Sequence, residues 1–436
     1  MAHLLIQVSA LGMASPLAIA RAQQATRLRP DYVMDMLPLI AASSSGGGSI
    51  ELPSGCTGSK FQQSWQTRTF FDDSDDEQKI RFEGDNYEFM RDDSRRTLSY
   101  YAAIRERLAA SAEGQVVLDL GTGSLALLAL EAARAGAKRV YAIESQPESA
   151  QLAREAVAAA GYSGVVEIVE GKSTCVTLPE KVDLLVSETV GSMASEEGLY
   201  ATMADAHRRH VKRPTEAASW IPHRVQTMGA PCSWALHYGL GLPDYNWYQM
   251  PTPPRIAAED ATVQVLSDPQ LVEDIDLTRL ESLLAAGSHA LTPPEGIVFT
   301  IEGARVRANQ RGYEVACTPP KVLDGRETGS SAAEAREAAA SFAAGVASSV
   351  SGIAMWPRLT LNPASTWVVE ARGSECEPQP SSWQTLLPLI SDRPMPVAAG
   401  DTVTVKVSIE LGEDVTMPPR YTIEGATSFV GRIRDS

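Results

Sequence analysis

The feature that most constrains the fold is a fourfold alternation of apolar, strand-like runs and helix-like segments. A helical pattern covers residues 92–113, and two more follow at 125–135 and 147–160. Four apolar runs lie beside them: QVVLDL (115–120), RVYAIE (139–144), VVEIVEG (165–171) and KVDLLVSE (181–188). Strands buried on both faces are apolar throughout, and short alternating units favour right-handed crossovers. The pattern predicts a doubly wound α/β domain with a parallel sheet.

The pattern changes after Pro222. Short β-like runs replace the helices, and Pro and Gly separate them; they cover residues 296–303, 356–361, 365–371, 402–411 and 420–425. This is typical of an antiparallel sandwich or barrel. Residues 331–346 are rich in Ala and predict a helical insertion. We therefore expect three parts: an N-terminal extension (1–84) with a flexible SSSGGGS linker at 43–49, the parallel-sheet domain (85–222), and a β domain (223–436).

Composition limits the functions that fit such a chain. Its 436 residues suggest two domains, and its net charge of −16 argues against direct nucleic-acid binding. The charge suits a cationic partner, although it serves solubility equally well. The five cysteines form no C-x-x-C pair, so we expect reduced thiols, no metal site, and a cytoplasmic or nuclear protein. No stretch predicts a membrane span, and the first twenty residues make a poor signal peptide, although a cleaved targeting segment stays open.

A glycine turn follows the first buried strand and opens a helix. It contains Asp119, Gly121 and Gly123, and Glu144 ends the next strand 23 residues after Gly121. Glycines let the backbone approach a ligand, and an acid at the end of the second strand binds ribose hydroxyls in nucleoside-binding folds. Position 126 is Ala, which disfavours the dinucleotide motif, and no phosphate-loop Lys follows. The pattern favours S-adenosylmethionine; a tight turn without a ligand is the alternative.

Two acids follow the fourth strand. Glu188 comes at its carboxyl end and Glu197 nine residues later, on a loop that can fold back. A pair of carboxylates matches the planar fork of N–H donors on a guanidinium. On the residues alone, a helix cap and a surface acid are the favoured explanation. Glu196 adjoins Glu197, so spacing alone selects the second acid.

These motifs together resemble the protein arginine methyltransferases. The segment SETVGSMASEEG is similar to the loop in which that family holds the target guanidinium between two glutamates, here Glu188 and Glu197. The segments VLDLGTG and YAIE resemble its cofactor motifs, IPHR its crossing into a β-barrel, and SSWQTLLPLI its Thr-His-Trp loop. The resemblance is nearest the monomethylating (type III) branch, through GKST at 171–174 and ADAHRRH at 204–210.

The resemblance implies a fold, a reaction and roles for particular residues. It implies a Rossmann-like class I methyltransferase domain followed by an antiparallel β-barrel. The implied reaction transfers a methyl group from S-adenosylmethionine to an arginine guanidino group in a protein or peptide, with histone-like sequences as one substrate class. Glu188 and Glu197 would be catalytic. The implied cofactor-binding residues are Arg96, for the cofactor's carboxylate, with Asp119, Gly121, Gly123, Glu144 and Ser173. Trp383 would lie beside the substrate, and a homodimer would form through an arm, with residues 235–251 as a candidate.

The sequence also departs from the family pattern. Leu125 replaces a third glycine, Ser382 replaces the histidine of the Thr-His-Trp loop, and Ser173 stands where many members have an adenine-contacting acid. Two alternatives therefore stay open. One is a methyltransferase for free arginine or another small amine, and the other is an inactive scaffold of the same fold.

Overall fold

The computed structural model of the chain describes residues 37–42, 48–49, 51, 56–66, 84–111, 114–240, 253–413 and 418–430. The linker predicted at 43–49 lies mostly outside these residues. No helix among the described residues combines the length and apolar character needed to cross a membrane.

The predicted parallel sheet is confirmed. Its strands are β2 (Val116–Leu120), β3 (Arg139–Glu144), β4 (Val166–Glu170), β5 (Leu184–Ser187) and β6 (Trp220–Ile221). They are all parallel, in the order β4-β3-β2-β5-β6. The order reverses between β2 and β5, where the crossovers leave for opposite faces. Ligands of such sheets bind at the carboxyl ends of the strands at this switch point.

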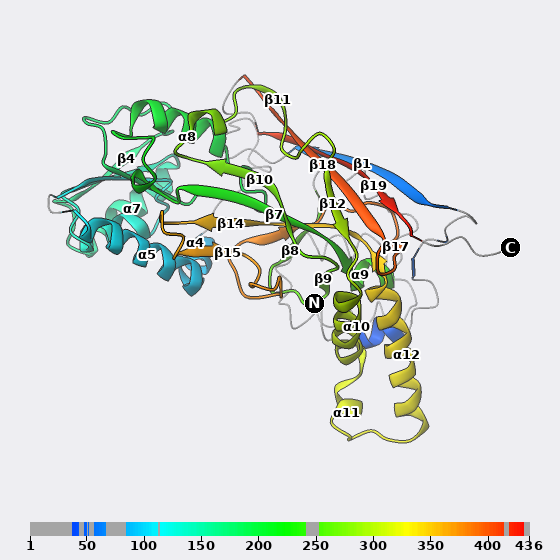
Figure 1. Cartoon of the computed structure of the whole chain (residues 1–436). Coiled ribbons are helices and arrows are strands. Elements are labelled where there is room, and N and C mark those ends of the chain that lie inside the picture. Colours follow the sequence, from blue (N-terminus) through cyan, green and yellow to red (C-terminus); the bar gives the residue numbers. More distant parts are fainter. Residues whose placement is uncertain are drawn as a thin grey trace.

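Helices flank the parallel sheet and form the rest of this domain (Figure 1). They are α4 (Gly84–Asp92), α5 (Ser94–Ala109), α6 (Leu127–Arg134), α7 (Pro147–Ala159), α8 (Leu199–Arg209) and the short η1 (Ala217–Ser219). The helix predicted at 92–113 is shorter at both ends: α5 ends at Ala109 and begins only at Ser94, because Asp93 caps it and its side chain accepts a hydrogen bond from the Arg96 backbone N–H at 3.1 Å. The buried face of α5 includes Tyr100, Ile104 and Leu108.

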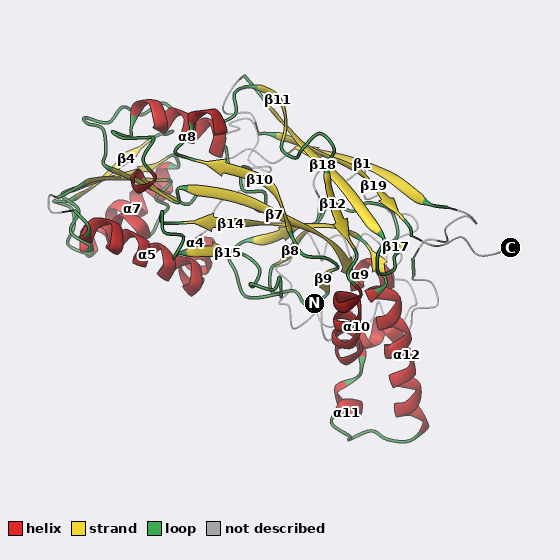
Figure 2. Ribbon diagram, viewed as in Figure 1, coloured by secondary structure: helices red, strands yellow, loops and turns green. Residues whose placement is uncertain are grey.

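The second domain consists of antiparallel sheets (Figure 2). The larger sheet contains β7 (Arg224–Trp234), β8 (Arg255–Ala257), β9 (Val263–Val265), β10 (Gln270–Asp276), β14 (Gly352–Thr360), β15 (Val368–Glu370) and β16 (Gln384–Leu386). The other contains β1 (Gly58–Gln66), β11 (Gly287–Ala290), β12 (Ile297–Thr300), β18 (Thr402–Leu411) and β19 (Arg420–Ser428). A short pair joins β13 (Ser349–Val350) to β17 (Met395–Pro396). Among the described strands, no pairing joins the two large sheets, so the expected closed barrel is not present in their hydrogen bonding.

One strand of the second domain comes from a segment that the sequence placed elsewhere. The sequence set residues 1–84 apart as an extension, whereas β1 pairs along its whole length with β19, from Gly58 with Ser428 to Gln66 with Arg420. Trp65 of β1 stacks on Tyr421 with ring centroids 5.6 Å apart. This strand is hard to predict from the sequence, because few of its residues are apolar although its positions alternate between buried and exposed.

A pair of helices projects from the second domain (Figure 1). The predicted Ala-rich helix is present as α12 (Ser330–Ala347), which packs directly against α10 (Gly303–Cys317); the short α11 (Pro320–Leu323) lies between them in the chain. Both also pack near α9 (Ala235–Leu240) and the helical residues 37–42, through Leu37, Phe342 and other buried side chains. A 3-10 turn, η3 (Leu280–Ser282), follows β10. Of the candidate arm at 235–251, only residues 235–240 are described.

Candidate functional site

A cavity lies at the carboxyl edge of the parallel sheet, at the switch point. It encloses about 590 Å³ of empty space, part of it open to solvent. The residues that line it come from the ends of β2, β3, β4 and β5 and from the start of α8: Leu120, Gly121, Ile143, Ser145, Gly171, Lys172, Ser173, Thr174, Thr189, Glu197, Ala201 and Thr202. Three of the predicted site residues, Gly121, Ser173 and Glu197, are therefore on its wall.

The glycine turn forms one wall of this cavity. Gly121 has a φ of +79°, and a Cβ atom at this position would lie 2.9 Å from Thr189 Cγ2. Gly123 also has a positive φ, of 65°. Both the backbone conformation and the close approach of Thr189 require the absence of a side chain at Gly121. The residue at the missing third glycine, Leu125, has no such conformation; the left-handed residue is its neighbour Ala126, with a φ of 46°.

Asp119 lies beneath the turn and holds it. It is 1% exposed, and its Oδ2 accepts hydrogen bonds from Thr122 Oγ1 at 2.6 Å and from the Ala129 backbone N–H at 2.9 Å. Burial raises the pKa of Asp119 to about 6, and these two hydrogen bonds oppose the shift. Its described contacts make it a support for the turn, whereas the sequence grouped it with the cofactor-binding residues.

Glu144 ends β3 as predicted, and its carboxylate joins two backbone segments. One oxygen accepts a hydrogen bond from the Gly123 N–H at 3.0 Å and the other from the Gln146 N–H at 2.9 Å. A carboxylate has about four acceptor positions, so capacity for ligand hydroxyls remains. On the opposite wall, the Ser173 carbonyl oxygen accepts a hydrogen bond from Arg209 Nη2 at 3.0 Å.

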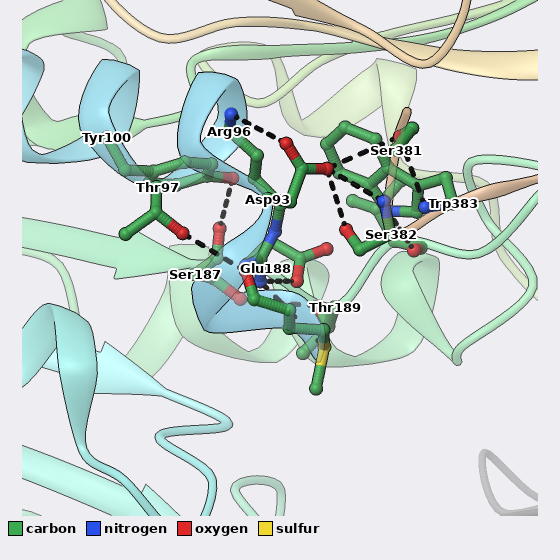
Figure 3. Close-up of polar contacts among 12 residues, drawn as sticks. Asp93, Arg96, Thr97, Tyr100, Ser187, Glu188, Thr189, Ser381, Ser382 and Trp383 are labelled. Atoms are coloured by element: carbon green, nitrogen blue, oxygen red, sulfur yellow. Dashed lines mark hydrogen bonds and ion pairs between the residues drawn. The ribbon is translucent and has the colours of Figure 1, made fainter. Parts of the chain in front are cut away.

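Arg96 and Glu188 form a buried ion pair between α5 and the end of β5 (Figure 3). Their side chains are 10% and 8% exposed, and the Arg96 guanidinium also donates to the Met90 carbonyl oxygen at 2.9 Å. Its buried Nε has no hydrogen-bond partner among the described residues. Burial raises the pKa of Glu188 even though the positive charge of Arg96 lowers it. The sequence did not anticipate this pairing, because it assigned the two residues to different ligands.

The structure separates the neighbouring acids Glu196 and Glu197. Glu196 points to Arg255 of β8 and accepts two hydrogen bonds from its guanidinium, at 2.7 and 3.0 Å. Glu197 lines the cavity instead. Burial raises the pKa of Glu197 to about 8, and the negative charges of Glu188 and then Glu196 add to the shift. The negative charge of Glu188, at the other end of the loop, thus contributes to the raised pKa of Glu197.

Trp383 packs against the same loop from the second domain. Its Nε1 donates to the Val190 carbonyl oxygen at 3.0 Å, and the Arg96 guanidinium carbon lies 6.0 Å from the centre of its ring. The indole is 6% exposed. Ser382, in the place of the expected histidine, donates through its backbone N–H and its hydroxyl to Asp93 Oδ2, at 2.7 and 3.1 Å.

Asp93 is the main residue of the site that the sequence analysis missed. It caps α5, and the same carboxylate holds Ser382 from the second domain (Figure 3). An acid before a helical pattern is a recognisable capping signal. Its second contact has no sequence signal, because 289 residues separate Asp93 from Ser382. Among the described residues, no group of three or more His, Cys, Asp or Glu side chains is placed to hold a metal ion.

These features define a two-domain protein: a Rossmann-like domain with a glycine-turn cavity at its switch point, joined to an antiparallel sheet domain that packs on the cavity loop. The family model described as PRMT5 arginine-N-methyltransferase matches residues 78–216, which cover this parallel-sheet domain. The chain thus has homologues among the protein arginine N-methyltransferases.

Two curated relatives illustrate the extent of the similarity. Protein arginine N-methyltransferase PRMT10 of Oryza sativa subsp. japonica is 38% identical over 128 residues, 28% of this chain and 33% of the relative. Probable protein arginine N-methyltransferase 6 of Arabidopsis thaliana is 30% identical over 235 residues, 49% of this chain and 52% of the relative. The matches thus span about a third to a half of these relatives.

A solved structure shares the fold over most of the chain. The Trypanosoma brucei PRMT1 enzyme-prozyme heterotetrameric complex with AdoHcy matches with a TM-score of 0.52 and 17% identity, over 80% of this chain and 95% of that one. At this identity the likeness concerns the fold. It covers the antiparallel domain as well as the parallel sheet, since neither domain alone makes up 80% of the chain.

Proposed function

We propose that the chain is an S-adenosylmethionine-dependent methyltransferase that adds one methyl group to the guanidino group of arginine in proteins or peptides. One observation carries the proposal: Glu188 and Glu197 lie at the two ends of one loop, and Glu197 lines the cavity at the glycine turn, where the negative charge of Glu188 helps to raise its pKa. The homologues support it, because those with curated names are arginine methyltransferases.

The residues around the cavity fit the proposed cofactor. The glycine turn lines the cavity, and a Cβ atom at Gly121 would be crowded by Thr189 Cγ2. Glu144 keeps acceptor capacity for ribose hydroxyls, and Arg96 has a buried Nε without a described partner, suited to a carboxylate. These residues, with Gly123 and Ser173, would hold S-adenosylmethionine, which supplies a methyl group on a sulfonium.

The two acids would bind the substrate. A guanidinium keeps its charge at all physiological pH values, and its nitrogens are poor nucleophiles. Glu188 and Glu197 would orient it and draw positive charge toward the nitrogen that does not attack. Good alignment alone can contribute about 7–11 kcal/mol to the barrier reduction. The raised pKa of Glu197 also makes it the better acceptor of the proton that the methylated nitrogen loses.

Labelled cofactor provides the direct test. The protein should methylate an Arg-Gly-rich, histone-like peptide and leave free arginine unmodified, and mass spectrometry should show one methyl group per modified arginine. Preference for free arginine would instead identify a small-molecule enzyme. Calorimetric binding of S-adenosylhomocysteine without any transfer would identify an inactive scaffold, and Arg96→Gln should weaken that binding.

Assembly is a separate part of the proposal. We propose a homodimer formed through an arm of the second domain, to which residues 235–251 contribute, and a β-barrel formed by the two large sheets of that domain without β-pairing between their described strands. Sedimentation equilibrium of the purified chain would test the dimer. The proposed cellular location is the cytoplasm or nucleus.

A further inference from the structure

The loop that joins the two acids, residues 188–198 (the acid loop), belongs to the parallel-sheet domain but is held by the second domain. Arg255 of β8 makes the most extensive contact. Its Nη1 donates to Ser192 Oγ at 2.9 Å, and its two terminal nitrogens bind both oxygens of Glu196. The Glu196 side chain is 5% exposed and that of Arg255 31%. The partly buried, bidentate geometry makes this contact stronger than an ordinary surface pair.

A second anchor holds the loop independently of Arg255. Glu273 of β10 is 1% exposed and accepts hydrogen bonds from Ser195 Oγ at 2.6 Å, from Tyr200 OH at 2.9 Å and from Thr227 Oγ1 at 2.8 Å. Thr227 in turn accepts the Ala194 backbone N–H at 2.9 Å. Because this network stays intact without Arg255, a change at Arg255 is expected to leave the path of the loop in place.

The charge of Arg255 reaches the second acid as well. Four charged groups face Glu197: the acids Glu188 at the end of β5 and Glu196 beside it, and the cations Arg255 of β8 and Arg96 of α5. Lys172, after β4, lines the same cavity. Arg96 is already paired with Glu188. Arg255 is therefore the cation that offsets the charge of Glu196.

We propose that Arg255 is a positioning residue for arginine methylation: by binding Glu196 on both oxygens, it removes that acid from competition for the substrate guanidinium and leaves Glu197 as the acid of this pair that faces the cavity. The proposal rests on the proposed function. It assigns the second domain a part in setting the charge of the site. Without Arg255, Glu196 becomes an uncompensated buried acid one residue from Glu197, and the ionised form of Glu197 becomes harder to reach.

Kinetic pH profiles test this role. Arg255→Gln should lower kcat/KM at pH 7 by about tenfold, the effect of one pKa unit, and should move the alkaline rise to higher pH. Arg255→Lys keeps the charge and should keep the wild-type profile. Glu196→Gln/Arg255→Gln removes both charges and should restore the profile. Arg224→Gln, which removes the ion pair with Asp274 on neighbouring strands, is the matched control and should have no effect.

A second measurement does not depend on turnover. The ¹³C carboxyl resonance of Glu197, assigned by its loss in Glu197→Gln, should titrate at higher pH in Arg255→Gln than in the wild type. An unchanged midpoint, or equal pH profiles for Arg255→Gln and the wild type, would overturn the proposal. If the wild type methylates no arginine, the proposed function fails, and the resonance still shows whether Arg255 sets the charge of Glu197.

Discussion

The two ends of the acid loop differ in what neutralises them. Glu188, at the start, is paired with Arg96 within the parallel-sheet domain. Glu197, near the end, has no ion-pair partner among the described residues and depends on Arg255 of the second domain, which binds its neighbour. The first acid therefore has a cation in direct contact, which opposes the rise in its pKa that burial causes. The second stays close to its titration point, so the two ends respond differently to mutation and to pH.

Removing the charge of Glu188, at the start of the acid loop, should have the largest effect on methyl transfer. Glu188→Gln keeps the shape of the side chain but removes one of the charges that bind a guanidinium. We expect methyl transfer to fall by about 10²–10³-fold, the usual cost of one charge-stabilising group. Binding of S-adenosylhomocysteine, measured by calorimetry, should stay nearly intact. The control is Glu410→Gln, because Glu410 is an exposed residue of β18 that pairs with Arg420. Retained turnover in Glu188→Gln would refute the role of Glu188 in binding the guanidinium.

The titration of Glu197, near the end of the acid loop, should determine how kcat/KM depends on pH. With a pKa of about 8, Glu197 is about one-tenth ionised at pH 7. A guanidinium binds the carboxylate form, so kcat/KM should rise by about tenfold from pH 7 to pH 9 and fall as pH drops through 8. The substrate arginine does not titrate in this range. Glu197→Gln should lose the rise, and a flat wild-type profile would contradict this assignment.

The glycine turn lines the same cavity as Glu197, and substitution of Gly121 should have two separable effects. Gly121→Ala adds a methyl group at positive φ and brings it to 2.9 Å from Thr189 Cγ2, whereas Gly136→Ala has the same backbone cost in open space. Each should lose about 1 kcal/mol of stability through φ alone. Only Gly121→Ala should also weaken S-adenosylhomocysteine binding by several-fold.

Thermal unfolding and calorimetry of both alanine variants check this expectation. Gly121→Ala/Thr189→Ser removes the crowding methyl group and should recover part of the lost affinity. Equal affinities for Gly121→Ala and Gly136→Ala would show that the turn does not contact the cofactor.

The smallest effect is expected at Ser382. Its hydroxyl donates to Asp93 at 3.1 Å, but its backbone N–H makes the shorter bond to the same oxygen and survives substitution. Ser382→Ala should cost about 1 kcal/mol or less and change kcat by less than about threefold. Asp93→Ala removes every bond at once and should cost more. A large loss of kcat in Ser382→Ala would show that the hydroxyl acts in the reaction.

The sequence predicted the parallel-sheet domain well because its signals are local. Continuous apolar runs gave the strands, and β3 has the predicted bounds, Arg139–Glu144. The positions of the glycine turn and of the strand-end acids could be predicted from the strands, because residues that directly follow parallel strands lie at one edge of the sheet. Gly121, Ser173 and Glu197 were named from this pattern and from the family resemblance, and all three lie on the cavity wall.

The second domain and its contribution to the site could not be predicted in the same way. The strand β1 pairs with β19 across a sequence separation of more than 350 residues, and nothing local in GSKFQQSWQ announces its partner. Likewise, Arg255 meets Glu196 only because β8 packs beside the acid loop. Spacing selected Glu197 over Glu196, but the contact that binds Glu196 to Arg255 has no sequence signal.

The pairing of β1 with β19 has a practical consequence for anyone who shortens this protein. A chain that starts at α4 would retain every motif of the cavity. It would lack β1, so β19 would become an unpaired edge strand and Tyr421 would lose its stacking contact with Trp65. An unpaired edge strand is a template for self-association. Such a truncation should precipitate or oligomerise, although all of its predicted catalytic residues are present.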